Sequence, residues 1–107
     1  MNLAFADKLP AEWLELSRVF MALGHEQRQK ILLMFEPGEQ LQLLQIVQTS
    51  GLSRTAVMHH LRLLTDAGIL RRQRLGKEVS YSLDAAFLLD ALTRVEKYVR
   101  DYYGEQK

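Results

Sequence analysis

Cysteine is absent from the 107 residues of this chain. Its absence excludes disulfide bonds, thiolate metal sites, cysteine nucleophiles and thiol-based redox sensing. Long apolar runs are absent as well, and no run of about 18 apolar residues offers a transmembrane helix. The first residues, MNLAFADKLP, lack the basic start and the long apolar stretch of a signal peptide. We therefore expect a cytoplasmic protein with no membrane partner.

The residue patterns of common active sites are missing too. The sequence contains no glycine-rich phosphate loop, no activated nucleophile and no carboxylate pair in an apolar setting. We therefore expect neither enzyme activity nor a cofactor. Because no linker or repeat divides the chain, it should form one domain over residues 1–107, large enough for a single core.

Charge is unevenly distributed along the chain, although the net charge is only +1. Residues 1–52 hold four basic and six acidic residues, and residues 82–107 hold four and five. Between them, residues 53–81 hold six basic residues against two acidic ones. A basic segment inside a slightly acidic chain is typical of a surface that binds a polyanion, although a solvated basic face would look the same.

Apolar residues at helical spacing predict the first two helices. One runs from Pro10, which suits a first helical position, to near Gly24. The other covers about residues 26–35, and the sequence PGE at 37–39 ends it.

Two further helices lie close together. The third covers about residues 43–49, and Ser53 caps a fourth, which ends at Gly68. Only three or four residues around Gly51 separate them. Two short helices joined by a tight turn that contains glycine predict a helix-turn-helix.

Two strand-like runs, at residues 70–74 and 79–83, come next, and Gly76 between them can take the positive φ of a hairpin turn. Asp84 then caps a last helix that reaches about Tyr103. The expected fold is mainly α with a small β-hairpin, a winged helix-turn-helix of about five helices and a two-stranded wing.

The fourth helix carries a polar face that folding alone does not require. A helix of this kind fits the major groove of DNA, and the basic hairpin beside it reaches neighbouring phosphates or the minor groove. We therefore expect binding to double-stranded DNA through Ser53, Arg54, Thr55, Met58, His59, Arg62, Arg72, Arg74 and Lys77. The alternative is a winged-helix adaptor that mainly contacts another protein and whose polar face is only solvated.

Three segments resemble the ArsR/SmtB-type (arsenic-repressor-like) winged-helix transcriptional regulators. ALGHEQRQKIL at 22–32 is similar to the second-helix signature of that family, GLSRTAVMHHLRLLTDAGIL at 51–70 to its recognition segment, and GKEVSYSL at 76–83 to its wing. The motifs follow the family's order and spacing over about residues 13–102. The resemblance implies a sequence-specific transcriptional regulator, which we expect to be a repressor, acting as a homodimer on an inverted-repeat operator.

The last helix supports a homodimer independently, because nine apolar or tyrosine residues share one side of it, more than a small core can cover. The expected interface is formed by the first and last helices through Trp13, Leu16, Phe20, Phe87, Leu88, Leu92, Val95, Tyr98, Val99 and Tyr102. The alternative is that the last helix folds back on its own domain. A small organic effector, if there is one, should lodge among the aromatic residues of these helices, although an interface core explains them more simply.

The resemblance also implies metal sites whose ligands this sequence lacks. Many relatives have a Cys-x-Cys pair where this chain has Gln42 and Leu44. On the last helix Asp84 is in place, but Ala86, Lys97 and Arg100 stand where relatives have histidine. Because lysine and arginine repel a cation, we expect no metal site and no response to metals, arsenite or thiol oxidants.

The three histidines do not supply a metal site either. His59 and His60 are adjacent, so their side chains diverge by about 100° on a helix. We expect His59 to face DNA or solvent, and His60 to be a buried, hydrogen-bonded core residue rather than a ligand. His25 stands where it would cap the second helix.

Overall fold

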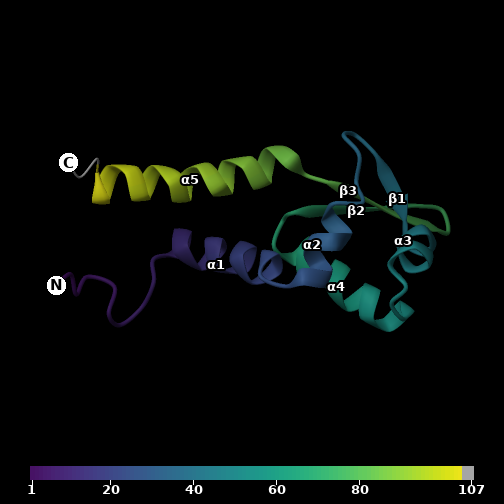
Figure 1. Cartoon of the computed structure of the whole chain (residues 1–107), viewed down its shortest axis with the longest axis horizontal. Coiled ribbons are helices and arrows are strands. Elements are labelled where there is room, and N and C mark those ends of the chain that lie inside the picture. The colour runs from purple at the N-terminus through teal and green to yellow at the C-terminus, as the bar shows by residue number, and fades with distance from the viewer. Residues whose placement is uncertain (105–107) are drawn as a thin grey trace.

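The computed structural model describes residues 1–104 (Figure 1). Its elements are α1 (Ala11–Leu23), α2 (Glu26–Leu32), β1 (Gln40–Gln42), α3 (Leu43–Ser50), α4 (Arg54–Asp66), β2 (Leu70–Leu75), β3 (Glu78–Leu83) and α5 (Ala85–Tyr103). The predicted winged helix-turn-helix, with five helices and a hairpin, is confirmed. Every helix in the described part of the chain is too short or too polar to cross a membrane.

Helix α2 ends three residues earlier than its apolar pattern predicts. The amides of residues 34 and 35 bond to carbonyl oxygens three residues back, at 3.1 and 3.2 Å. This tighter turn ends the helix ahead of Pro37, because proline disfavours helical backbone in the residue before it.

The sheet has a third strand that the sequence pattern does not predict. Strand β3 is central and pairs antiparallel with β1 on one side and with β2 on the other. Leu41 of β1 lies opposite Tyr81, so the short strand extends the sheet at its base. The β2–β3 hairpin is the wing, and Gly76 at its tip has the expected positive φ, 62°.

The core draws its buried side chains from all five helices and from the hairpin. Its members include Leu16, Val19, Ala22, Ile31, Ile46, Val57, Leu61, Leu64, Ile69, Leu70, Tyr81 and Ala91. Helix α5 contributes only Ala91 to this buried set. Most of the apolar side of α5 therefore lies at the edge of the core or outside it.

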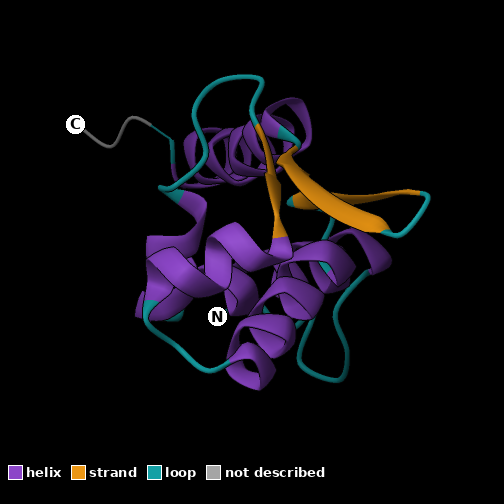
Figure 2. Ribbon diagram, turned by 90° about the vertical axis from the view of Figure 1, so that its right-hand side faces the viewer, coloured by secondary structure: helices purple, strands orange, loops and turns teal. Residues whose placement is uncertain are grey.

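Helices α1 and α5 lie side by side and extend from the body that the other elements form (Figures 1 and 2). The chain is accordingly elongated, with extents of 52 × 28 × 25 Å. The recognition helix α4 and the wing lie toward one end, and the N-terminus and the last turns of α5 lie toward the other (Figure 1). This arrangement separates a candidate DNA-binding end from an arm of two helices.

Candidate nucleic-acid interface

Helices α3 and α4 are joined by the tight turn that the sequence predicts. Gly51 closes α3 in the left-handed conformation, with φ of 72°. The hydroxyl of Ser53 then accepts a hydrogen bond from the amide of Ala56 at 3.1 Å, which caps α4. The Ser53 oxygen therefore acts as a helix cap. Its hydroxyl proton is still available to donate a hydrogen bond to another group.

Burial divides α4 as helical spacing predicts. Val57, Leu61 and Leu64 are fully buried and fix the helix on the core. The exposed side chains include Arg54, Thr55, Met58, His59 and Arg62. The packed side thus holds the polar side outward on a rigid support, as a helix that enters a DNA groove requires.

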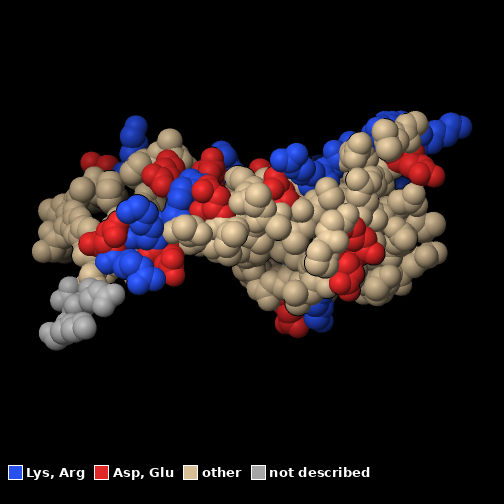
Figure 3. Space-filling view, turned by 90° about the horizontal axis from the view of Figure 1, so that it is seen from above, with Lys and Arg blue, Asp and Glu red and all other residues tan. Residues whose placement is uncertain are grey.

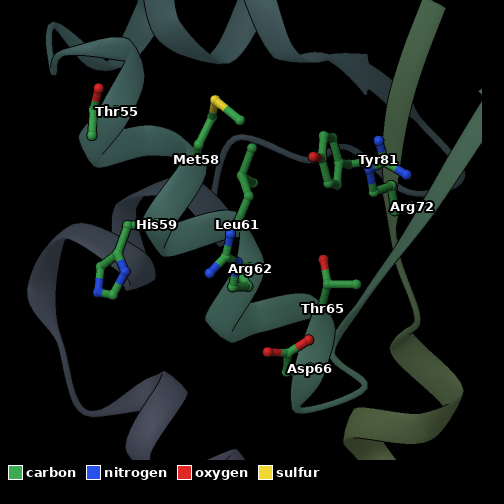
Figure 4. Close-up of a pocket in the computed structure, with 9 residues that line it drawn as sticks. All are labelled: Thr55, Met58, His59, Leu61, Arg62, Thr65, Asp66, Arg72 and Tyr81. Atoms are coloured by element: carbon green, nitrogen blue, oxygen red, sulfur yellow. The ribbon is translucent and has the colours of Figure 1, made fainter.

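A groove of about 580 Å³ lies between α4 and the strands of the hairpin (Figure 4). It is lined by Thr55, Met58, His59, Leu61, Arg62, Thr65, Asp66, Arg72 and Tyr81. Its only carboxylate, Asp66, belongs to the last turn of α4, away from the start of the helix. The Thr65 hydroxyl is buried in the wall with no hydrogen-bond partner in residues 1–104. The groove therefore offers two guanidinium groups and the exposed hydroxyl of Thr55 to a bound molecule.

Five cations on α4 and the wing form no ion pair with any residue of the described chain. They are Arg54, Arg62, Arg72, Arg74 and Lys77, and all five are exposed. Only Arg74 makes a local contact, a hydrogen bond from its Nε to the carbonyl oxygen of Gly76 at 3.2 Å. Their charge is therefore not neutralised by any acidic side chain in residues 1–104.

Most other cations of residues 1–104 are neutralised or buried. Ion pairs engage Lys30, Arg71, Arg94, Lys97 and Arg100, and Arg28 is buried. Basic side chains gather at the hairpin end in Figure 3, whereas basic and acidic side chains mix over the arm. The excess of positive charge therefore lies on the surface formed by α4 and the wing.

Arg71 belongs to the basic segment, but it forms an ion pair with Asp84 of its own chain. Its Nε lies 2.8 Å from one oxygen of Asp84, whose other oxygen accepts from the amide of Phe87 at 3.0 Å. The Phe87 amide, and after it Arg71, hold the pKa of Asp84 below its ordinary value of 3.8. Asp84, the one ligand position kept from the family's last-helix metal site, is thus occupied as a helix cap and ion-pair partner.

The histidines lie where their spacing predicts. His25 Nδ1 accepts from the amide of Gln27 at 3.1 Å and caps α2. His60 is buried, with its Nδ1 3.2 Å from the guanidinium of Arg28, and His59 is exposed on α4. Within residues 1–104, no three side chains of His, Cys, Asp or Glu converge on a common point. Helical spacing places Arg28 on the side of Ile31 and Phe35, but its charge predicts an exposed side chain.

One of the predicted interface residues has no surface left for a partner. Leu16 is only 2% exposed and belongs to the core of its own chain, so that prediction is corrected. Partly buried positions on the same helices are Trp13, Phe87, Leu88, Val95 and Tyr98. Those that remain exposed, by 41 to 53%, are Phe20, Leu92, Val99 and Tyr102, which we call the arm face.

Helix α5 does lie against its own domain, but only in part. Arg94 of α5 bonds to Glu15 of α1 at 2.7 Å, and Trp13 meets Tyr98 edge-on with ring centroids 5.2 Å apart. Tyr102 stacks on Tyr98 at 5.5 Å, and burial raises the pKa of the Tyr98 phenol above its ordinary value. These rings contact one another, which favours a packed helix pair over an effector cavity among them.

Comparison with known proteins adds a family to this geometry. Residues 23–73 match a family of helix-turn-helix domains. The cadmium resistance transcriptional regulatory protein CadC homolog of Staphylococcus aureus is 32% identical over 84 residues, which are 78% of this chain and 69% of that protein. The transcriptional repressor SdpR of Bacillus subtilis (strain 168) is 26% identical over 84 residues, 78% of this chain and 92% of SdpR.

A solved structure agrees over most of the chain. An ArsR-like transcriptional regulator from Rhodococcus sp. RHA1 superposes with a TM-score of 0.78, at 25% identity and 87% coverage of both chains. The chain belongs to the ArsR family. The resemblance carried by its three sequence motifs is thereby confirmed. As a member of the ArsR family it is a helix-turn-helix transcriptional regulator, and the region that matches the domain family includes the whole of α3 and α4.

Proposed function

We propose that this ArsR-family protein is a transcriptional repressor that binds an inverted-repeat operator as a homodimer. The observation that carries the proposal is the set of five cations on α4 and the wing that form no ion pair within the described part of the chain. Buried residues hold α4 so that its start can meet base edges, and the wing cations are placed to meet phosphates. The repressor role is also the printed function of the relative SdpR.

The homodimer is supported by the arm face. Four large apolar or aromatic side chains on α1 and α5 are 41 to 53% exposed, although most of the other large apolar side chains on these helices are buried or partly buried. Large apolar side chains left exposed on one pair of helices are candidates for an interaction site. A two-fold arrangement through these helices would present two copies of α4 to half-sites about one helical turn apart.

Salt dependence separates this proposal from an adaptor that mainly contacts another protein. If phosphates are neutralised by the wing and α4, the logarithm of the affinity should fall linearly with the logarithm of the salt concentration, by about 0.9 per phosphate contact. The measurement is fluorescence anisotropy with a duplex selected by the purified protein from random sequences. Selection of no sequence, or an affinity that does not depend on salt, would favour the adaptor.

Base and phosphate contacts should respond differently to substitution. Arg54→Ala is expected to reduce discrimination at one operator position by about 1–3 kcal/mol, because the start of α4 reads base edges. We expect the same class of effect for His59. Lys77→Ala or Arg74→Ala should weaken all sequences alike and reduce the salt slope by about one. Unchanged affinity and unchanged site preference in Arg54→Ala would contradict the groove assignment.

Operator binding should not respond to Zn²⁺, Cd²⁺, arsenite or thiol oxidants, although one relative is named for cadmium resistance. Cd²⁺ and arsenite need soft thiolates, and the chain has no cysteine. A tight zinc site needs about four ligands, and Asp84 is already held by Arg71. The measurement is an operator titration with and without stoichiometric Zn²⁺ in a chelator-controlled buffer. A shift of about tenfold or more would reveal a site formed elsewhere, for instance across the dimer.

A further inference from the structure

Arg28 is a buried cation without an acidic partner. Its side chain is only 6% exposed, and no carboxylate of the described chain lies within ion-pair distance of it. Burying a charge is costly unless hydrogen bonds replace its water. The position of Arg28 in the fold therefore depends on what its five N–H groups bond to.

Two of the partners of Arg28 belong to the last turn of α1. Its Nε donates to the carbonyl oxygen of Ala22 at 2.8 Å, and its Nη2 to that of Met21 at 3.0 Å. Carbonyl groups at a helix C-terminus lack helical partners and carry partial negative charge. Helix α1 has no basic residue in its own last turn, and Gly24 after it has φ of −80°, not the left-handed conformation of a usual cap. Arg28 thus caps α1 from the neighbouring helix.

The third partner belongs to the recognition helix. Arg28 Nη1 lies 3.2 Å from Nδ1 of His60. Because a guanidinium only donates, Nδ1 must accept, and the ring is therefore neutral with its proton on Nε2. One planar group therefore joins the end of α1 to the middle of α4. His60 is the immediate neighbour of His59, which the proposed function places at the DNA.

We propose that Arg28 is a positioning residue for DNA recognition, which fixes the orientation of α4 relative to α1 only while His60 is neutral. The proposal rests on the proposed function, in which α1 belongs to the dimer arm and α4 reads DNA. In a dimer, the angle between these helices sets where the two recognition helices lie along the duplex. Small errors in that angle at each half-site would prevent both from entering their grooves together.

Protonation of His60 would remove the acceptor and place a second cation against Arg28. Burial first, then His25, Arg28 and His59, hold the pKa of His60 below its ordinary value of 6.5. These groups face it from α2, its N-cap and α4, with the ring of His25 4.9 Å away, and no carboxylate acts among them in the described chain. Because the folded-state pKa is lowered, the stability due to neutral His60 is present above pH 6.5 and is lost as the pH falls below it.

The test compares operator affinity at about pH 7.5 and pH 5.5, at constant ionic strength, for variants of His60. His60→Asn keeps an oxygen near the place of Nδ1 but does not titrate. All the proteins compared carry His59→Asn, so that protonation of the exposed His59 at low pH does not contribute to the change in operator affinity. The probe is a duplex that the wild-type protein selects from random sequences at pH 7.5. We expect the affinity to fall with His60 present, by at most about tenfold for each His60 because its pKa lies below 6.5, and to fall several times less with His60→Asn.

Arg28→Lys is the second variant, since lysine keeps the charge but cannot bond three acceptors in one plane. We expect it to bind more weakly at pH 7.5 and to lose most of the pH response, with circular dichroism showing that it is folded. The proposal is overturned if the operator affinity of His60→Asn falls with pH as steeply as that of the protein that keeps His60. It is also overturned if Arg28→Lys retains both the affinity and the pH response.

A measurement on the wild-type protein without DNA makes the test independent of the variants. The ring ¹⁵N chemical shifts of His60 at pH 7.5 should show a proton on Nε2 and none on Nδ1. A protonated Nδ1 would overturn the proposal whatever the variants do. If the wild-type protein selects no duplex at pH 7.5, the proposed function fails first and the DNA role of Arg28 fails with it.

Discussion

Replacing Arg62 and Arg72 together with glutamate should weaken operator binding by roughly 100-fold or more at about 0.1 M salt. The two side chains line the groove from α4 and from β2, both exposed and neither in an ion pair within residues 1–104. Each phosphate contact contributes about 0.9 to the salt slope, which is close to tenfold in affinity at about 0.1 M salt. A salt series followed by anisotropy should therefore show the slope reduced by about two as well.

The control for this variant makes the same change of charge far from the groove. Lys8→Glu with Lys97→Glu alters the N-terminal segment and the distal half of α5, toward the other end of the molecule (Figure 1). Charges separated by much more than about 10 Å are screened at this salt concentration, so affinity should stay within about threefold. An equal loss in both double variants would mean that net charge, and not the groove, governs binding.

Placing aspartate at Leu92 and Val99 together should convert the protein to a monomer and weaken operator binding by roughly 100-fold. Both side chains belong to the arm face and are 43% and 49% exposed in the single chain. In a dimer they would be buried, and an unpaired buried carboxylate costs several kcal/mol. Light scattering should report 12.4 kDa for the variant and twice that mass for the wild-type protein.

Leu89→Asp is the matched control for the arm face. Leu89 is the one leucine of α5 that its helical spacing places apart from the apolar side, and it is 68% exposed. We expect this variant to remain a dimer with wild-type operator affinity. Binding to a duplex with a single half-site adds a second check, because the Leu92 and Val99 variant should match the wild-type protein there. A wild-type protein that is monomeric at micromolar concentration would refute the proposed dimer.

Local chemistry made the helix-turn-helix predictable. Ser53 and Asp84 are capping residues that stand just before apolar periodicity begins, and both cap as expected. The placement of His60 among the buried residues of α4 follows from a step of about 100° per residue. These features depend on neighbours within about one helical turn, and those neighbours are read directly from the chain. The polar face of α4 and the two strand-like runs of the wing could be predicted for the same reason.

What only the tertiary structure decided are the contacts between residues distant in sequence. Strand β1 is three residues long and exists because β3 offers it a partner some 40 residues later. Leu16 and the arm face share an apolar pattern, and only the packing of α1 on the core determines which of them is covered. Arg71 and Arg72 are adjacent and chemically alike, but the first meets Asp84, while the second lines the groove and forms no ion pair within residues 1–104.

The sequence by itself determined the five helices and the hairpin, the family and the position of the recognition helix, because periodicity, caps and turn residues act locally. The fold alone decided that Arg28 is buried between α1 and α4 with His60 as its acceptor. Helical spacing places Arg28 on the side of Ile31, but its partners, two backbone carbonyl groups and a ring nitrogen 32 residues away, have no local signature. Such a site appears only when three helices meet, because each supplies one part of a hydrogen-bonding set that none contains alone.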